Sequence, residues 1–401
     1  MRVSKKLAVV AVAASAALAL AACAPSTSAA TGPSAASGPK EITVGVITSE
    51  TGPLAGYGKE YLAGFQAGLD YATGGKGKVG GTTIKIERRD DAGTPDTAVN
   101  AAKELIGDGV NILVGSASSG VAAAVAQQAA QNQVLFISGP AAADALTGIN
   151  KYTFRSGRQS SQDVATAGSF LTDVSGKNIV VFAQNNAFGQ GNAAAVTAIL
   201  GGKGATVTPI LVAEDATEFT PFAQQVLAAK PDLVFVAWAG ATTGGMWQAL
   251  SQQGVLDSIP VVTGLGDSPT YGAYGDASTK INFLNHYFPG ANDHAVNKKM
   301  VAAIEKSGGA PDLFSPDGFN AAIMLVHAID KGKGDVDSMI TSLEGWSFDG
   351  PKGKTTVRAA DHALLQEMYQ VKLVADGGSF KPELVKAVAA DQVAPAETPF
   401  K

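Results

Sequence analysis

Short apolar segments alternate with longer amphipathic segments through the first part of the chain. The first apolar segment, residues 42–48, places Ile42, Val44 and Val46 on one face, as a half-buried strand does. Residues 59–71 then carry large apolar side chains at the spacing of a helix. Further strands are predicted around residues 84–86, 112–114 and 134–138, separated by a helix capped at Thr94 and a helix that follows Gly120. This βαβαβαβ order predicts a parallel sheet covered by helices.

The same alternation restarts after the middle of the chain and predicts a second sheet. Its strands are expected at residues 179–183, 207–212, 233–238, 259–262 and 367–374, and two long helices at 294–307 and 315–332. We therefore predict an α/β protein with two Rossmann-like lobes, each built on a parallel sheet. Ligands of such sheets bind at the carboxyl ends of the strands, so a cleft is expected there.

The N-terminus has the pattern of an export signal. Three basic residues precede an uncharged apolar stretch at residues 7–22, which is short for a membrane span. The stretch ends in Leu20-Ala21-Ala22-Cys23, which resembles a bacterial lipobox, and Cys23 is the only cysteine of the chain. We expect a lipoprotein signal peptide at 1–22, lipidation of Cys23 and a flexible tether at 23–39. The alternative is an ordinary signal peptide followed by an incidental cysteine.

Composition and charge narrow the function classes. The 401 residues are 46% hydrophobic and 16% charged, as in a globular protein with a sizeable core. The net charge is −5, and loss of the three basic residues of the leader makes it −8. A nucleic-acid partner is therefore not expected. With one cysteine, no intramolecular disulfide can form.

A turn crowded with serines, Gly115-Ser116-Ala117-Ser118-Ser119-Gly120, joins the predicted strand at 112–114 to a helix. Its hydroxyls and backbone N–H groups would face the cleft at a helix N-terminus, where a ligand carboxylate is stabilised. The alternative for Ser118 is a purely structural role as the helix cap. A nucleophile is disfavoured, because Ala117 stands where the serine of a G-x-S-x-G elbow is required.

The sequence disfavours two kinds of enzyme. Gly189, Gly191 and Ala194 fit the dinucleotide pattern G-x-G-x-x-A, but five residues separate Gly189 from the preceding strand, where a tight turn is required. Histidines that could serve as catalytic bases or metal ligands are scattered, at His286, His294, His327 and His362. We therefore expect no cofactor, no metal and no catalysis.

Several segments resemble one family. They read "ITVGVITSETGPLAGYG", "ILVGSASSGV", "LFISGPAAADALT", "YTFRS", "FGQGNA" and "KPDLVFVAWAG", in this order within residues 42–373. They resemble the leucine/isoleucine/valine-type solute-binding proteins of ABC importers. The resemblance implies the type 1 periplasmic binding protein fold, in which two lobes joined by a multi-strand hinge close on a small solute and hand it to a membrane permease. It implies lobes at 40–156 with 282–364 and at 157–281 with 365–390, followed by a C-terminal tail at 391–401.

The resemblance also implies the binding residues. A serine after the third strand binds the solute carboxylate in this family, and Ser119 holds that position beside Ser118. Ala142 stands where members that bind amino acids often have threonine. Gly266 takes the place of the carboxylate that pairs with a solute ammonium, and Asp267 follows it. The predicted ligand-binding residues are Tyr57, Ser118, Ser119, Pro140, Ala141, Ala142, Phe188, Trp238, Gly266 and Asp267.

These observations predict an extracytoplasmic solute-binding lipoprotein that captures an amino acid or a related small carboxylate for an ABC permease. Its expected partners are the solute, the permease subunits and the membrane through Cys23, and the chain is expected to be monomeric. The choice between an amino acid and an amine-free carboxylate stays open and depends on whether Asp267 faces the solute. The alternatives are a sensor domain that reports solute to a partner and an exported NAD-dependent or hydrolytic enzyme.

Overall fold

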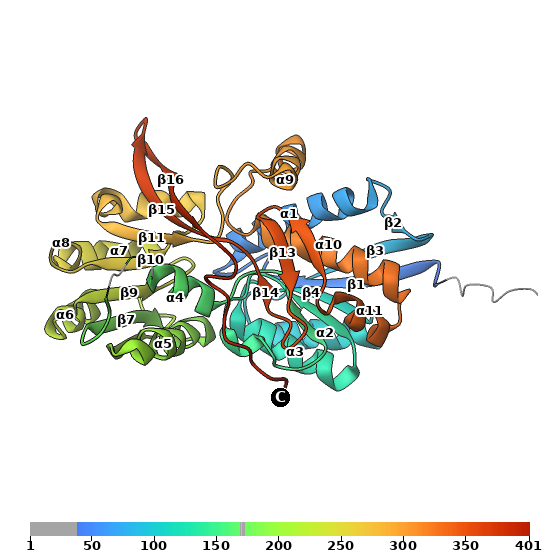
Figure 1. Cartoon of the computed structure of the whole chain (residues 1–401), viewed down its shortest axis with the longest axis horizontal. Coiled ribbons are helices and arrows are strands. Elements are labelled where there is room, and N and C mark those ends of the chain that lie inside the picture. Colours follow the sequence, from blue (N-terminus) through green and yellow to red (C-terminus); the bar gives the residue numbers. More distant parts are fainter. Residues whose placement is uncertain (1–37, 169, 171–172) are drawn as a thin grey trace, which may run out of the picture. The chain divides into compact units, whose positions relative to one another are not determined.

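The computed structural model describes residues 38–168, 170 and 173–401. The predicted signal peptide and Cys23 lie outside the described residues. Two sheets of mostly parallel strands, each covered by helices on both faces, make up the described chain (Figure 1), as the alternation of the sequence predicts. A third, small antiparallel sheet is added to them.

The first sheet is built from the N-terminal part of the chain. Its strands pair in parallel except at one edge, where β2 runs antiparallel to β3. In spatial order they are β2 (Lys78–Val79), β3 (Thr82–Asp90), β1 (Glu41–Thr48), β4 (Ile112–Gly115), β5 (Leu135–Ser138) and β6 (Thr153–Arg155).

Side chains alternate between the two faces of this sheet and define its layers. Val46 and Val114 pack against α1 (Ala55–Thr73), α10 (Ser315–Gly332) and α11 (Val336–Leu343). On the other face, Ile47 and Leu113 pack against α2 (Pro95–Gly107) and α3 (Ser119–Asn132). We call this sheet and its helices the first lobe. Two of its main helices, α10 and α11, therefore come from the last quarter of the chain.

The contact between α1 and α10 is close because glycines face it. A Cβ atom built on Gly64 would lie 1.9 Å from the carbonyl oxygen of Ser315, and one built on Gly318 would lie 2.0 Å from that of Tyr61. Side chains at either position would force the two helices apart. Helix α9 (Ala295–Lys306) then packs against this pair through a smaller apolar cluster.

The second sheet is parallel from β8 to β11 and carries two antiparallel strands at its other edge. In spatial order its strands are β16 (Ser379–Val388), β15 (Met368–Asp376), β11 (Ile281–Asn285), β10 (Val261–Gly264), β9 (Leu233–Ala237), β7 (Asn178–Gln184) and β8 (Thr206–Val212). Its helices are α4 (Ser160–Gly168) and α5 (Ala187–Ile199) on one face and α6 (Thr220–Ala228), α7 (Thr243–Gln252) and α8 (Val255–Ser258) on the other. We call these elements the second lobe.

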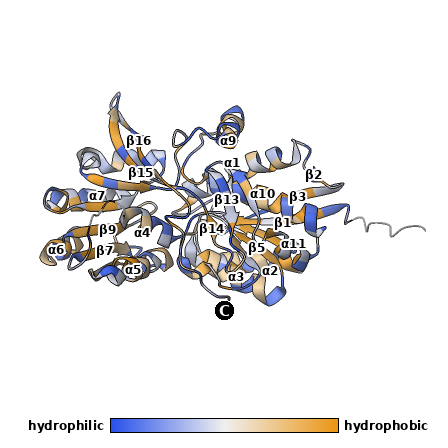
Figure 2. Cartoon of the chain, in the orientation of Figure 1, coloured by the Kyte–Doolittle hydropathy of each residue, from blue (hydrophilic) through white to orange (hydrophobic). Residues whose placement is uncertain are grey.

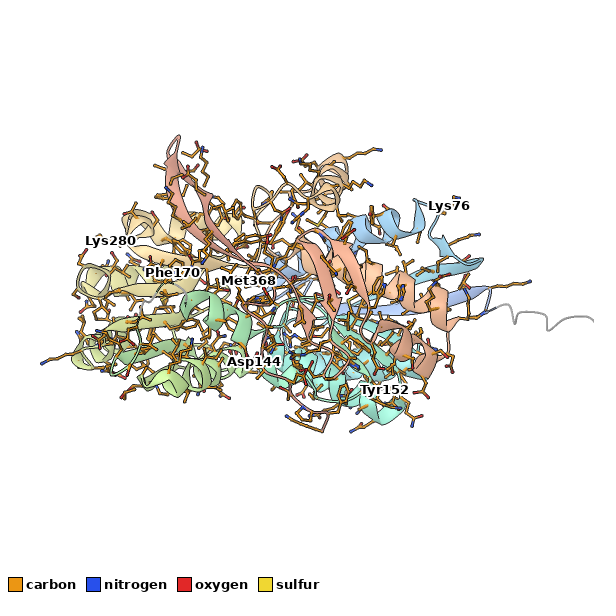
Figure 3. All side chains as sticks on the ribbon, in the orientation of Figure 1. Lys76, Asp144, Tyr152, Phe170, Lys280 and Met368 are labelled. Carbon is orange, nitrogen blue, oxygen red and sulfur yellow. The ribbon has the colours of Figure 1, made fainter. Side chains whose placement is uncertain are left out.

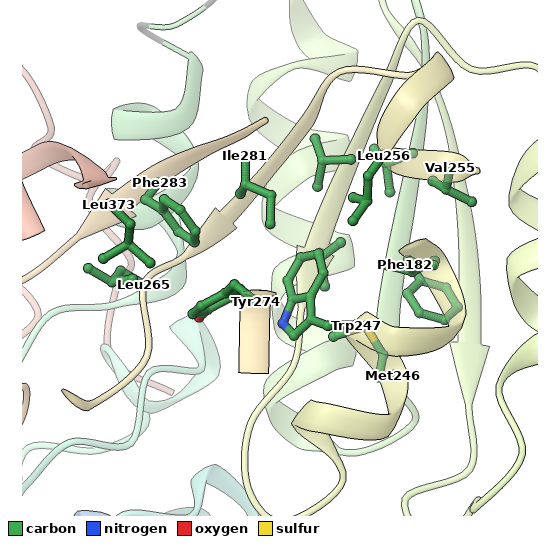
Figure 4. Packing of buried hydrophobic residues seen from close by; sticks show 14 of the residues in the cluster. Phe182, Met246, Trp247, Val255, Leu256, Leu265, Tyr274, Ile281, Phe283 and Leu373 are labelled. Atoms are coloured by element: carbon green, nitrogen blue, oxygen red, sulfur yellow. The ribbon is translucent and has the colours of Figure 1, made fainter. Parts of the chain in front are cut away.

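Large aromatic side chains fill the core of the second lobe (Figure 4). Trp247 lies against Tyr274, with ring centroids 5.3 Å apart, and Tyr274 meets the ring of Phe283 edge-on at 4.9 Å. Tyr274 belongs to the 3₁₀ segment η3 (Ser268–Thr279). Figure 2 shows that hydrophobic residues concentrate in the strands of both sheets, such as β5, β7 and β9.

The chain passes between the two lobes several times. It crosses after β6, after β11 and after β14 (Leu364–Leu365), which forms the small third sheet with β12 (Ser347–Gly350) and β13 (Gly353–Val357). The C-terminal residues then return to the first lobe, where Arg358 donates to the carbonyl of Pro395 at 2.7 Å and Asp361 accepts from the N–H of Thr398 at 3.0 Å. Figure 3 labels Asp144 and Met368 near these crossings.

Several details differ from the sequence-based expectations. Thr94 holds the N-cap position of α2, but its hydroxyl bonds to Thr97 Oγ1 and not to the helix backbone. Strand β16 was not predicted, because most of its side chains are exposed and carry no apolar alternation. The predicted lobe boundary between residues 281 and 282 falls inside β11. Among the described residues, no helix combines the length and apolar character that a bilayer crossing requires.

Candidate ligand-binding site

A cavity of about 390 Å³ opens at the carboxyl ends of the strands of both sheets. The first lobe contributes the loops after β1, β3, β4 and β5, and the second lobe those after β7, β8, β9, β10 and β11. At its mouth the lobes approach each other, since a Cβ atom on Gly240 would lie 3.2 Å from the carbonyl oxygen of Pro53. The cavity is therefore placed where a ligand would contact both lobes.

A buried carboxylate, that of Asp91, anchors the serine turn by hydrogen bonds. Asp91 accepts hydrogen bonds from Ser49 Oγ at 2.6 Å, from Ser116 Oγ at 2.5 Å and from the N–H of Gly93 at 2.7 Å. Asp91, Ser49 and Ser116 are almost completely buried. This carboxylate ties the ends of three loops together and fixes the turn that follows β4.

The two serines at the start of α3 have different roles in the structure. Ser118 is the N-cap, and its hydroxyl accepts from the N–H of Val121 at 3.5 Å. Ser119 Oγ accepts from the buried N–H of Ala143 at 3.1 Å. Its hydroxyl hydrogen has no acceptor among the described residues. The hydroxyl hydrogen of Ser118 likewise has no acceptor among the described residues, so both serines can donate to a ligand, and Ser118 also caps the helix.

Aromatic side chains form the apolar wall of the cavity. Tyr57 and Phe314 meet edge-on, with ring centroids 4.6 Å apart. Trp238 stacks on Phe182 at 5.4 Å, and its indole N–H donates to Thr242 Oγ1 at 3.0 Å, which fixes the ring. Phe188 adds a further ring from the start of α5. Burial, together with the charge of Asp267, raises the pKa of Tyr57, so its phenol stays protonated.

Polar side chains form the wall nearest to the chain crossings. Arg158 lines the cavity, donates to the carbonyl of Pro140 at 2.9 Å and lies 3.3 Å from Asp163 Oδ2. Asn285 and His286 line the same wall. Burial lowers the pKa of His286 well below its usual value, so this imidazole is neutral. The sequence analysis missed these residues, although Arg158 follows strand β6 at the edge of the sheet where ligands bind.

The structure brings eight of the ten predicted residues into the lining of the cavity: Tyr57, Ser118, Ser119, Pro140, Ala142, Phe188, Trp238 and Gly266. Ala141 and Asp267 lie outside the lining. Asp267 is buried, and its Oδ1 has no hydrogen-bond partner among the described residues. Burial and the charge of Asp312 raise the pKa of both Asp267 and Glu60. Asp267 thus belongs to an acidic cluster outside the lining of the cavity.

Gly189, the first glycine of the G-x-G-x-x-A pattern, has a packing role in the structure. Helix α5 begins at Ala187, so Gly189 lies within its first turn and not in a turn before it. A Cβ atom on Gly189 would lie 1.9 Å from the carbonyl oxygen of Gln184, so the glycine permits close packing of the helix on β7. Of the histidines, His327 stacks on Trp346 at 3.7 Å. No group of residues that could hold a metal occurs in the part of the chain that the structure describes.

Comparison with known proteins identifies the family. A family model described as periplasmic binding protein matches residues 41–378. The Leu/Ile/Val-binding protein BraC3 of Rhizobium johnstonii is 27% identical over 322 residues, which cover 79% of this chain and 87% of that protein.

Solved structures agree with this match. A protein of an ABC-type branched-chain amino acid transporter from Rhodopseudomonas palustris is 32% identical, with a TM-score of 0.72, and the alignment covers 88% of this chain and 97% of that one. A solute-binding protein from R. palustris in complex with benzoate is 25% identical, with a TM-score of 0.74 and coverage of 87% and 98%. The chain therefore belongs to the periplasmic binding protein family, the extracytoplasmic solute-binding proteins of ABC transporters that its sequence resembles.

Proposed function

We propose that this chain is a lipid-anchored solute-binding protein that captures an amino acid or a related small carboxylate and delivers it to an ABC permease. The observation that carries the proposal is the cavity itself. The free hydroxyl hydrogen of Ser119 at the N-terminus of α3 lies in the same cavity as the rings of Phe188 and Trp238. Hydrogen-bond donors at a helix N-terminus stabilise a ligand carboxylate, and aromatic rings pack against the apolar part of a ligand.

The names of the relatives support this ligand class. One R. palustris relative is named for branched-chain amino acid transport and another is in complex with benzoate. Branched-chain amino acids and benzoate are both small carboxylates with an apolar part. We propose that the chain acts by binding and not by catalysis, and that it works as a monomer. A sensor role for the same cavity is the second candidate.

A thermal-shift screen with amino acids, 2-oxo acids and aromatic acids tests the proposal. A ligand present at 100 times its dissociation constant stabilises the protein by about 2.7 kcal/mol, which raises the unfolding temperature measurably. We expect at least one of the three classes to do so. Absence of any shift across all three classes at millimolar concentration would refute the proposed ligand class.

Ser119→Ala is expected to weaken binding of a carboxylate by about 1–3 kcal/mol, because a charged acceptor loses its donor. The ligand-free protein should also lose about 1 kcal/mol of stability, since the buried N–H of Ala143 loses its acceptor. Isothermal titration calorimetry and denaturant unfolding measure the two effects.

Ser118→Ala is the matched control for this serine pair. It removes the N-cap of α3 and should cost about 1 kcal/mol of stability, and its loss of affinity, compared with that of Ser119→Ala, shows which hydroxyl donates to the carboxylate. Equal affinity of Ser119→Ala and the wild-type protein for the same ligand would assign Ser119 a structural role only.

Membrane attachment is proposed to depend on Cys23. The motif Leu20-Ala21-Ala22-Cys23 and the uncharged segment behind it motivate the proposal. Cell fractionation should find the wild-type protein in the membrane pellet and Cys23→Ala outside it. Recovery of the wild-type protein in the soluble fraction would exclude the anchor.

A further inference from the structure

Arg158 is the one permanently charged cation among the described residues that line the cavity. It lies in the loop after β6, and its side chain is mostly buried. Its Nη1 donates to the carbonyl of Pro140 at 2.9 Å, its Nε lies 3.3 Å from Asp163 Oδ2, and its Nη2 has no acceptor among the described residues. A guanidinium keeps its charge at any physiological pH. The cavity wall therefore carries a fixed positive charge whose counter-ion is Asp163, and Nη2 is left to donate to a ligand.

The segment after β5 lines the cavity at Pro140 and Ala142, and its backbone carbonyls already accept hydrogen bonds. Arg155 donates to the carbonyls of Ala141 at 2.6 Å and Ala143 at 3.0 Å. The carbonyl of Ala142 accepts from the N–H of Ser160 at 2.8 Å, and that of Pro140 accepts from Arg158. The Ala142 carbonyl accepts a second bond from Ser160 Oγ at 3.2 Å, and that of Ala143 accepts a second one from the N–H of Leu146. The Pro140 carbonyl accepts from Arg158 alone, but an ammonium that used it would lie beside a guanidinium.

The carboxylates that line the cavity also have partners within the protein. Among the described residues that line it, Asp163 and Glu214 are the acidic ones. Asp163 is almost completely buried and is paired with Arg158. Glu214 is exposed and accepts from Asn186 Nδ2 at 3.0 Å. Asp163 Oδ1 has no hydrogen-bond partner among the described residues, but the charge of Asp163 is balanced by Arg158. Neither carboxylate is therefore a buried anion without a counter-ion, which a ligand ammonium requires.

Unpartnered donors remain on the same surface. The N–H of Ala142 and the hydroxyl hydrogen of Ser119 have no acceptor among the described residues. Asn285 is 1% exposed, lines the cavity, and neither its amide nitrogen nor its amide oxygen has a hydrogen-bond partner in the described chain. Buried polar groups of this kind are normally satisfied by water or a ligand.

From this arrangement we infer that Arg158 makes the cavity selective for carboxylates that carry no amine, an inference that rests on the proposed function. The guanidinium and the neighbouring donors attract the anionic group of the ligand. The same guanidinium lies beside two acceptors of the cavity wall, the Pro140 carbonyl and Asp163, and repels an ammonium that approaches them. Arg158 is thus the residue that sets specificity, and the ligand is an amine-free organic acid with an apolar body.

Calorimetric titration of the wild-type protein with matched acids tests this selectivity. The pairs are 3-phenylpropanoate with phenylalanine and 4-methylpentanoate with leucine, which differ by the amine. We expect the preferred amine-free acid to bind at least about 100-fold more tightly than its amino acid, because an unpaired buried ammonium costs several kcal/mol. Tighter or equal binding of the amino acid in both pairs would overturn the inference.

Arg158→Gln tests the residue itself. Glutamine can still donate to the Pro140 carbonyl but carries no charge, so the amine-free acid should bind about 10- to 100-fold more weakly. Its advantage over the amino acid should fall below about tenfold, and Arg158→Lys should restore part of it. An unchanged preference in Arg158→Gln would remove Arg158 from the recognition of the anion.

Two further variants test whether a carboxylate near the cavity binds the ammonium of an amino acid. Glu214→Gln and Asp267→Asn each remove one carboxylate near the cavity, and neither should change the ratio of the two affinities. A selective loss of amino acid binding in either variant would show that the carboxylate serves an ammonium, which contradicts the inference. Because Arg158→Gln leaves Asp163 without its ion pair, the double variant with Asp163→Asn is measured beside it, with thermal unfolding as a check on folding.

The results distinguish failure of this inference from failure of the proposed function. Binding of amino acids without their amine-free partners would refute the role of Arg158 and leave solute capture intact. Failure of all four acids and of the wider screen would refute the proposed ligand class, and the inference with it.

Discussion

Gly318→Ala is expected to lower the free energy of unfolding by about 3 kcal/mol, because the new methyl group has no room. It would lie 2.0 Å from the carbonyl oxygen of Tyr61 on the facing helix. The obstacle is backbone, so no rotamer change relieves the contact. Helix α1 is itself packed against the first sheet through Phe65, so it cannot withdraw without opening that core. Denaturant unfolding followed by circular dichroism measures the loss.

Gly107→Ala is the matched control for this substitution. Gly107 ends helix α2, its φ is not positive, and a Cβ atom there would have no neighbour within 4 Å. Alanine should therefore be neutral or add up to about 1 kcal/mol. A stability of Gly318→Ala within about 1 kcal/mol of the wild-type protein would show that α1 and α10 can separate at little cost, contrary to our interpretation.

Asp91→Ala is the second substitution from which we expect a large effect, a loss of about 3 kcal/mol or more. The carboxylate satisfies two buried hydroxyls, of Ser49 and Ser116, and the N–H of Gly93. Its removal leaves these donors without an acceptor and also leaves a void. Since Ser116 belongs to the serine turn, ligand affinity should fall together with stability. Unfolding and calorimetric titration on the same preparation record both.

The neighbouring Asp90 provides the control. It also accepts several hydrogen bonds, including that of Thr51 Oγ1 and the N–H of Glu50, but it is half-buried, so water can replace it. Asp90→Ala should therefore cost about 1 kcal/mol and leave affinity almost unchanged. Equal effects of the two aspartates would mean that burial of Asp91 does not matter to the turn.

The sheets could be predicted because their strands are buried on both faces. Such strands read as short apolar runs, of which residues 112–115 and 135–138 are examples, and every residue of both is buried. Once two parallel sheets are predicted, the cavity follows, since ligands bind at the carboxyl ends of the strands. The serine turn was found for the same reason, because it directly follows β4.

The polar wall could not be predicted in this way. Arg158 is placed by a contact with Pro140 and by an ion pair with Asp163, and neither leaves a periodic signal in the sequence. The acidic surroundings of Asp267 come from Glu60 and Asp312, which are distant from it in sequence. Local pattern identifies which loops reach the cavity, whereas the orientation of a charged side chain depends on partners that only the folded chain brings together.

The packing of α10 against α1 also constrains the order in which the molecule can form. The core of the first lobe combines Val44 and Phe65, near the start of the described chain, with Met324 and Leu343, near its end. Contacts between such distant segments are slow to form. The face of the first sheet that packs against α1, α10 and α11 therefore cannot be buried completely until the chain has been made to residue 343. Through most of synthesis the nascent chain has an exposed apolar surface and no finished lobe, which is the condition in which a polypeptide can still be threaded through a narrow export channel.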